Sequence, residues 1–307
     1  MSVMRDVLLW ASRNETLKRQ VPRWGFVKRA LRQFMPGERL EDALETATML
    51  AGKGVASMFT KLGENLTEPA QADAVVEHYL GAYERIAALG LDTEISVKPT
   101  QLGLDLDPEH AARGLETLAA KAEEMGNWLW IDMESSEYVQ PTIDLYRRVK
   151  DKHFPVGVCL QAYLWRTPQD IADLIPLQPG IRLVKGAYKE PASQAITRRA
   201  EIDEAFFRQG ADLLIADGVR LALATHDVAL LNRLEVVAQA AGRARDSYEI
   251  QMLFGIRMED QYRYAAEGYA MRDLTAYGDQ WYPWYLRRLA ERPANLAFVA
   301  RNVFARD

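Results

Sequence analysis

The stretch Val156-Gly-Val-Cys-Leu-Gln161 decides the fold of this chain, because five small or apolar residues run without a break and end in one polar residue. A continuous apolar run of this length predicts a β-strand covered on both faces, as in a parallel sheet. Longer stretches rich in Ala, Leu, Glu and Arg flank it and predict helices. The same alternation recurs along the chain, and the other predicted strands are Val55–Phe59, Glu94–Lys98, Trp128–Met133, Ile181–Lys185, Arg220–Thr225, Glu249–Phe254 and Tyr269–Leu274.

Eight such units in about 250 residues predict an α/β fold, the (β/α)8 or TIM barrel. An open doubly wound sheet would also alternate strands and helices, but no Gly-x-Gly-x-x-Gly follows a predicted strand. No Pro/Gly/Ser-rich linker divides the chain. We therefore expect one domain over residues 1–307, with N-terminal helices in 1–45 and the barrel and a C-terminal helix in 46–307.

The composition restricts the class of protein. With 307 residues, 49% of them hydrophobic, the chain can bury a large core. The net charge of -5 argues against nucleic acid as a partner. The single cysteine, Cys159, excludes an internal disulfide and sits in an apolar strand. No apolar run is long enough to cross a bilayer, and we expect a cytoplasmic location.

Residues 1–35 carry a local basic excess, with eight Arg or Lys against Asp6 and Glu15, interleaved with Trp and Phe. This pattern is typical of a helix that rests on an anionic membrane surface. The alternative is the charged outer face of helices that pack on the main domain. Peripheral contact at the inner face of a membrane is therefore a hypothesis for this segment.

Polar residues gather where the predicted strands end, which in a barrel is the active-site face. They are Lys98, Asp132, Glu134, Gln161, Arg182, Lys185 and the run Thr225-His226-Asp227. Each alone could belong to a structural ion pair. The four histidines show no ligand spacing, and the cations at this face would oppose a divalent metal, so we expect no metal site. These residues at the rim of the barrel, where the strands end, are therefore better suited to bind an anion.

A second cationic feature lies near the C-terminus, in Trp281-Tyr-Pro-Trp-Tyr-Leu-Arg-Arg-Leu-Ala-Glu291. Arg287 and Arg288 stand side by side in an aromatic helix. A guanidinium binds a carboxylate through two parallel hydrogen bonds, and neighbouring rings keep water away. Weak surface ion pairs with residues such as Glu291 are the simpler alternative.

Six ordered motifs resemble those of proline dehydrogenase. They are Ser96-Val-Lys-Pro-Thr-Gln-Leu-Gly-Leu104, Asp132-Met-Glu134, Leu160-Gln-Ala-Tyr-Leu-Trp-Arg-Thr167, Arg182-Leu-Val-Lys-Gly-Ala-Tyr188, Ala224-Thr-His-Asp227 and Tyr285-Leu-Arg-Arg-Leu-Ala-Glu291. The resemblance spans roughly residues 45 to 300. It is closest to the small monofunctional bacterial enzymes, so we expect no fused aldehyde dehydrogenase domain.

The resemblance implies a distorted (β/α)8 barrel that carries FAD. It also implies oxidation of L-proline to Δ1-pyrroline-5-carboxylate and transfer of the electrons to a membrane quinone. A separate pyrroline-5-carboxylate dehydrogenase would act downstream.

The resemblance also assigns roles to residues by their place in the motifs. Lys98, Arg287 and Arg288 would bind the proline carboxylate, and Asp132 and Arg182 would be catalytic. Glu64 would pair with Arg287 as a gate over the site. The FAD contacts would be Met133, Gln161, Lys185, Gly186, Ala187, Thr225 and His226.

Two positions depart from the family pattern. Leu274 stands where the family commonly has a tyrosine at the end of strand eight, and Trp284 replaces a usual tyrosine before the arginine pair. Two other functions remain open from the residues alone. A lysine on a barrel strand, Lys98 or Lys185, could serve a Schiff-base lyase. The other possible function is that of a barrel that binds a small carboxylate without catalysis.

Overall fold

The computed structural model describes residues 14, 33–63, 66–152, 155–282 and 286. Eight parallel strands form a closed barrel in chain order, and β1 pairs with β8 to close it. The predicted (β/α)8 barrel is confirmed. The strands are β1 (Ala56–Lys61), β2 (Thr93–Val97), β3 (Leu129–Ile131), β4 (Val156–Gln161), β5 (Gly180–Val184), β6 (Arg220–Ala224), β7 (Glu249–Leu253) and β8 (Ala270–Tyr277).

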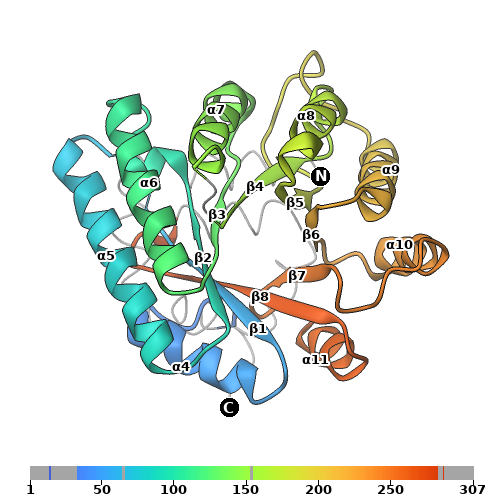
Figure 1. Cartoon of the computed structure of the whole chain (residues 1–307), viewed down its shortest axis with the longest axis horizontal. Helices are drawn as coiled ribbons and strands as arrows, with labels where there is room; N and C mark the ends of the chain where they lie inside the picture. Colours follow the sequence, from blue (N-terminus) through green and yellow to red (C-terminus); the bar gives the residue numbers. More distant parts are fainter. Residues whose placement is uncertain (1–13, 15–32, 64–65, 153–154, 283–285, 287–307) are drawn as a thin grey trace.

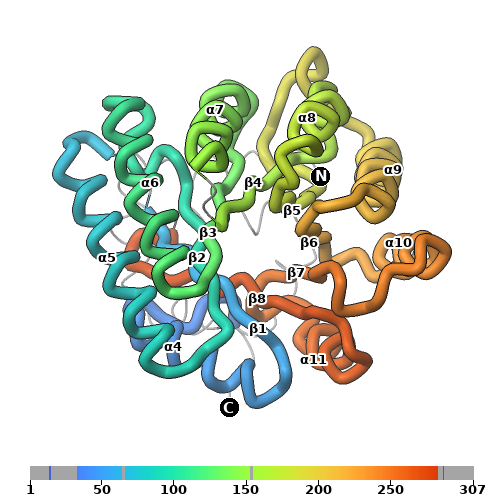
Figure 2. Tube along the Cα trace, in the orientation of Figure 1, coloured from blue at the N-terminus to red at the C-terminus, as the bar shows by residue number. Residues whose placement is uncertain are grey.

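Helices surround the barrel in chain order, from α4 to α11, and the tube trace shows the same ring (Figures 1 and 2). The α-helices are α4 (Leu40–Ala51), α5 (Pro69–Ala88), α6 (Pro108–Glu124), α7 (Val139–Lys150), α8 (Thr167–Leu174), α9 (Arg199–Ile215), α10 (Val228–Ala240) and α11 (Met258–Ala266). Short 3-10 helices are η2 (Pro99–Leu102), η3 (Ser136–Tyr138) and η4 (Ile175–Leu177). No helix in the described ranges is long and apolar enough to cross a membrane.

Helix α6 shows why these segments fold as they do. Asp107 caps its first turn, because the carboxylate accepts hydrogen bonds from the backbone N–H groups of Glu109 and His110 at 2.9 and 3.2 Å. Pro108 occupies the first helical position, where no N–H is needed. The buried residues Ala111, Leu115, Leu118 and Ala122 follow the helical period and pack into the main core. Polar residues cover the opposite face.

Each predicted strand overlaps an observed one, and three ends differ by more than a residue. Strand β1 continues to Lys61 rather than ending at Phe59. Strand β3 stops at Ile131 rather than Met133, so Asp132 lies just beyond the strand. Strand β8 continues to Tyr277 rather than ending at Leu274, because its partner β1 extends to Lys61, which pairs with Tyr277. The prediction that Leu274 ends strand eight is therefore wrong.

Alternate residues of each strand point into the barrel. This is evident from contacts between strands that are not neighbours: Arg182 of β5 reaches Met58 of β1, and Arg220 of β6 reaches Glu94 of β2. Met58, Trp130 and Ala222 form a small apolar cluster that is separate from the outer core, and Leu274 packs against it. Leu274 therefore fills the inside of the barrel, where its apolar side chain fits.

Helix α4 crosses the expected boundary at residue 45 and packs on β1 and β8. Its buried residues Ala43, Leu44, Ala47 and Leu50 join the core between barrel and helices. This part of the N-terminal region is thus built into the barrel domain. The basic segment 1–35 lies almost wholly outside the described residues.

Candidate active site

Arg182 is the centre of the candidate site. It lies in the middle of β5, points into the barrel and is 4% exposed. Its guanidinium forms an ion pair with Asp132 Oδ1 and donates to Ser96 Oγ at 2.9 Å and Met58 Sδ at 3.0 Å. Burial by itself lowers the pKa of Arg182, but the adjacent Asp132 carboxylate outweighs it and the pKa is raised. A permanent positive charge is therefore fixed below the mouth.

Asp132 links Arg182 to Lys98. Its Oδ2 atom lies 3.9 Å from Lys98 Nζ, whereas Oδ1 faces Arg182. The side chains of Lys98 and Asp132 are 16% and 17% exposed, so they line the opening of the barrel rather than its sealed interior. Residues that follow β2 and β3 thus meet a residue of β5. An anion that entered the mouth would meet Lys98 first and Arg182 below it.

A layer of paired charges supports this group from the N-terminal side of the barrel. The indole N–H of Trp130 donates to Glu94 Oε2 at 2.6 Å, and Arg182 lies over the Trp130 ring, 5.3 Å from its centre. Glu94 also contacts Arg220 and Arg272. We call Glu94, Arg220, Glu249 and Arg272 the lower ionic layer. The charges of its two carboxylates and two guanidiniums compensate each other.

The predicted cofactor residues on β4, β5 and β6 lie along the neighbouring part of the rim. The Gln161 amide is buried and donates to the Glu134 carbonyl at 2.8 Å. Lys185 Nζ donates to Asp203 Oδ1 at 2.5 Å and Asp227 Oδ2 at 2.9 Å. Burial raises the pKa of Asp227, but its hydrogen bond from Lys185 prevails and the pKa is lowered. These charges hold the end of β5 against α9 and α10.

The next residues at this rim are Thr225 and His226. Thr225 Oγ1 accepts from the Asp227 N–H at 3.2 Å, and His226 Nε2 accepts from the Leu253 N–H at 3.0 Å. Both contacts fix the turn between β6 and α10. His226 is therefore anchored to the end of β7 through its ring.

The backbone conformation at position 186 requires a glycine. Its φ of 113° is a conformation that residues with a Cβ rarely adopt, and an added Cβ would lie 2.2 Å from the ring of Tyr163. Ala187, which follows it, is exposed, and Met133 is buried. The Lys185-Gly-Ala187 turn thus leaves β5 tightly packed on the aromatic ring.

Residues without an assigned role complete the site. Ser96 is part of the first motif but has no predicted function, although it lies on β2 two positions before Lys98, which follows the strand. Glu134 anchors η2: its carboxylate accepts from the Thr100 hydroxyl at 2.8 Å and from the Thr100 N–H at 3.2 Å. The period of the strand could have identified Ser96.

The structure brings together Lys98, Asp132 and Arg182 and places the other predicted cofactor residues along the same rim. Glu64, Trp284, Arg287 and Arg288 lie outside the described residues. The two candidate lysines for a Schiff-base enzyme, Lys98 and Lys185, both face carboxylates. In the described part of the chain no group of three or more His, Cys, Asp or Glu is placed to hold a metal ion.

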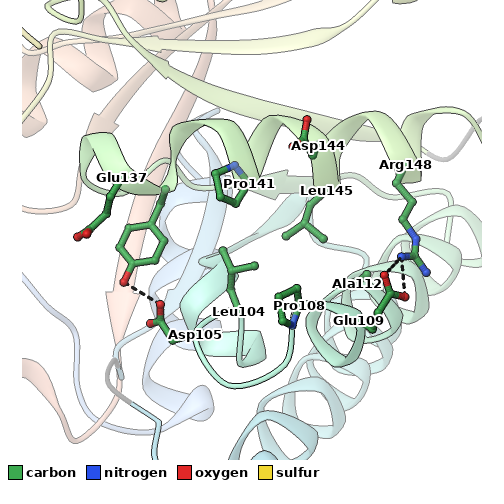
Figure 3. Close-up of a pocket in the computed structure, with 11 residues that line it drawn as sticks. Leu104, Asp105, Pro108, Glu109, Ala112, Glu137, Pro141, Asp144, Leu145 and Arg148 are labelled. Atoms are coloured by element: carbon green, nitrogen blue, oxygen red, sulfur yellow. Dashed lines mark hydrogen bonds and ion pairs between the residues drawn. The ribbon is translucent and has the colours of Figure 1, made fainter.

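A cavity of about 500 Å³ lies elsewhere, between α6 and α7 on the outside of the barrel. Figure 3 shows its apolar floor around Leu104 and Leu145 and the ion pair of Arg148 with Glu109 at one end. None of the predicted site residues lines it. The barrel mouth, where the charged side chains converge, is therefore the candidate active site.

Comparisons with known proteins identify the family. Residues 43–301 match the family model for proline dehydrogenase. Proline dehydrogenase 1 of Bacillus subtilis (strain 168) is 35% identical over 301 residues, which make up 98% of this chain and 99% of that protein. The proline dehydrogenase of Deinococcus radiodurans is 35% identical over 294 residues, covering 94% of this chain and 93% of the other.

A solved structure shares the fold. It is proline utilization A (PutA) from Bdellovibrio bacteriovorus, inactivated by N-propargylglycine, with a TM-score of 0.82 and 21% sequence identity. The match covers 99% of this chain and 38% of that longer protein. At this identity the likeness supports the barrel architecture alone.

Proposed function

The chain belongs to the proline dehydrogenase family, and on that premise we propose that it oxidises L-proline to Δ1-pyrroline-5-carboxylate with bound FAD. The observation that carries the proposal is the group formed by Lys98, Asp132 and Arg182 at the mouth of the barrel. It supplies two cations and one carboxylate in a partly closed space. Such a group can hold a small amino acid by its carboxylate beside a fixed positive charge.

The donors at the rim have the chemistry that a flavin nucleotide needs. Arg182, Gln161 and Thr225 offer a guanidinium, an amide and a hydroxyl on neighbouring strands. Among the described residues, the structure gives Lys185 two ion pairs, with Asp203 and Asp227. An ammonium has three N–H donors, so a third could serve a phosphate oxygen. We assign these residues to FAD, together with Met133, Gly186, Ala187 and His226.

FAD supplies the capacity to accept a hydride from the substrate. The residues of the chain contribute position and charge. Arg182 would stabilise the negative charge that develops beside it during oxidation, and Asp132 would hold Arg182 and Lys98 in place. Lys98 would bind the proline carboxylate with Arg287 and Arg288. The product of this step is a cyclic imine, since proline loses one hydrogen from nitrogen and one from C5.

We further propose a membrane quinone as the electron acceptor and a separate pyrroline-5-carboxylate dehydrogenase for the product. The basic and aromatic composition of residues 1–35 supports a peripheral contact with an anionic membrane. Such a contact would be reversible and weakened by salt. Co-sedimentation with anionic vesicles at low and high salt would measure it.

The function is tested by the absorption spectrum of the purified protein. We expect a yellow holoprotein whose flavin absorbance is bleached by L-proline without oxygen. A flavin that stays oxidised at saturating proline would exclude the activity. Colourless protein that borohydride links covalently to a carbonyl substrate would favour the Schiff-base lyase, and colourless protein that only binds proline would favour the carboxylate-binding barrel.

A further inference from the structure

Ser96 is a fully buried hydroxyl that joins the two proposed catalytic residues. Its Oγ–H donates to Asp132 Oδ1 at 2.8 Å, and the same oxygen accepts a hydrogen bond from Arg182 Nη2 at 2.9 Å. Arg182 Nη2 also contacts Asp132 Oδ1 directly. The three side chains therefore close a triangle in which each group contacts both others.

The triangle gives the two oxygens of Asp132 different partners. Oδ1 accepts a hydrogen bond from Ser96 and forms the ion pair with Arg182, and Oδ2 faces Lys98 Nζ at 3.9 Å. A carboxylate that lost its bond from Ser96 could turn about its last torsion, because that torsion is soft. Rotation would exchange the two oxygens and disturb the geometry of both cations.

Two further contacts of Arg182 are weaker than the one with this hydroxyl. Nη1 donates to Met58 Sδ at 3.0 Å, and a thioether is a weak acceptor. Beneath the guanidinium is the ring of Trp130, which attracts a cation but allows it to slide and turn across the face. Ser96 is the neutral oxygen that defines the direction of Nη2.

The register of the sheet explains why a serine reaches this point. Ser96 of β2 pairs with Trp130 of β3, so Lys98 and Asp132 each stand two residues further along the chain, just beyond the ends of these strands. A short side chain at position 96 ends just below Asp132, in the space between it and Arg182. A longer side chain would displace one of them.

We propose that Ser96 is a positioning residue for proline oxidation: its hydroxyl holds Arg182 on Oδ1 of Asp132 in one orientation and leaves Oδ2 for Lys98. The proposal rests on the proposed function. It goes beyond the assigned catalytic pair, because Ser96 acts through Arg182 and Asp132 without touching the substrate. Its loss should chiefly affect the oxidation step and the flavin environment.

The test compares Ser96→Ala with Ser57→Ala. Ser57 is a matched control, because it is a buried strand serine whose Oγ has no hydrogen-bond partner among the described residues. Three quantities are measured on flavin-loaded protein: the reduction potential of the flavin, kcat and KM for L-proline. For Ser96→Ala we expect a lower potential and a kcat reduced by roughly tenfold or more, with a smaller change in KM. Ser57→Ala should match the wild type.

A second measurement separates this proposal from the proposed function. Urea unfolding of Ser96→Ala, Asp132→Asn and the double variant gives a mutant cycle that needs no activity. Non-additive losses would support the triangle even if proline failed to reduce the wild-type flavin, in which case the function alone would fail. Additive losses would overturn the positioning role, as would a Ser96→Ala enzyme with wild-type potential and kcat, or equal losses in Ser57→Ala.

Discussion

Gly157 of β4 faces Trp130 of β3 so closely that a Cβ added to the glycine would lie 2.5 Å from the indole ring. The next strand repeats the arrangement, since a Cβ on Gly180 would lie 2.5 Å from Trp128. Two tryptophans are thus accommodated inside the barrel because two facing positions lack side chains. Trp130 forms the floor under Arg182 and Trp128 lies against Arg220, which links packing in the barrel to the candidate site.

Gly157→Ala should destabilise the protein, because the methyl group must displace a buried ring in a filled interior. Overpacking of this kind costs about 1–3 kcal/mol. Gly81→Ala is the control: Gly81 lies inside α5 with nothing within 4 Å of an added Cβ, and alanine favours the helix there. Urea unfolding of both variants checks the difference. Equal stability of the two would contradict the close packing of Trp130.

Glu249→Gln should lower the free energy of unfolding by about 3–5 kcal/mol, because Arg220 and Arg272 would then share Glu94 as the one carboxylate of the layer, which leaves one positive charge there without compensation. Glu249 accepts from Arg220 at 2.5 Å and from Arg272 at 3.2 and 3.3 Å in the lower ionic layer. The exposed pair of Glu201 and Arg198 offers a control, since Glu201→Gln should change stability by less than about 1 kcal/mol. If Glu249→Gln also changed the free energy of unfolding as little as Glu201→Gln, the lower ionic layer would not be needed for stability.

Within this layer, Glu249 predicts a loss of stability in acid. Burial raises the pKa of Glu249, but Arg272 and Arg220 outweigh it and bring the pKa to about 2, below its ordinary value of 4.5. A lowered pKa in the folded state adds stability above about pH 4.5 that disappears as the pH falls toward 2. The Glu249→Gln variant should therefore approach the wild type in stability as the pH falls.

Asp273 predicts a pH dependence of opposite sign. Its side chain is buried on β8, Thr275 donates to Oδ1 at 2.8 Å, and Oδ2 has no hydrogen-bond partner among the described residues. Burial raises its pKa from 3.8 to about 7. A raised pKa favours the folded state below about pH 4, and this stability is lost as the pH rises to about 7.

Asp273→Asn removes the titrating group while keeping its shape. Relative to the wild type, the variant should gain stability between pH 4 and pH 8, by up to about 4 kcal/mol. Asp217→Asn, at an exposed position, should show no such gain. Thermal unfolding at pH 5 and pH 8 measures the difference, and parallel curves for wild type and Asp273→Asn would show that the buried carboxyl does not titrate in this range.

The barrel could be predicted because its strands are buried on both faces. Runs such as Val156–Gln161 are therefore almost continuously apolar, and polar residues mark their ends. Strand ends were harder to predict, because they depend on the partner strand: β8 extends to Tyr277 only because β1 reaches Lys61. Leu274 accordingly lies inside the barrel instead of at a strand end.

The sequence predicted which charged residues lie at the candidate site, but it did not predict which residues they contact. Lys98, Asp132 and Arg182 converge because parallel strands bring their carboxyl ends to one face. The pairing of Lys185 with Asp203 could not be foreseen, since Asp203 lies on α9 and outside the motifs. Long-range ion pairs of this kind depend on how the helices pack, and no local pattern encodes that.

The last prediction concerns recognition of the substrate carboxylate by Lys98. If Lys98 binds this group, Lys98→Met should raise KM for L-proline, and loss of a charge-assisted contact of about 1.5–3 kcal/mol corresponds to roughly 10–150-fold in kcat/KM. Flavin content should stay unchanged. Lys152→Met is the control, because Lys152 forms an ion pair with Glu116 at the surface, at 2.7 Å and far from the motifs that form the mouth.

Pyrrolidine makes this test specific, because it is proline without the carboxylate. The wild type should use proline much better than pyrrolidine, and Lys98→Met should narrow that ratio by lowering activity with proline alone. Loss of activity with both amines would place Lys98 in the oxidation step through Asp132, its neighbour at 3.9 Å. Loss of flavin would instead assign Lys98 to the cofactor. An unchanged ratio in a flavin-loaded variant would remove Lys98 from the carboxylate site, which would then depend on Arg287 and Arg288.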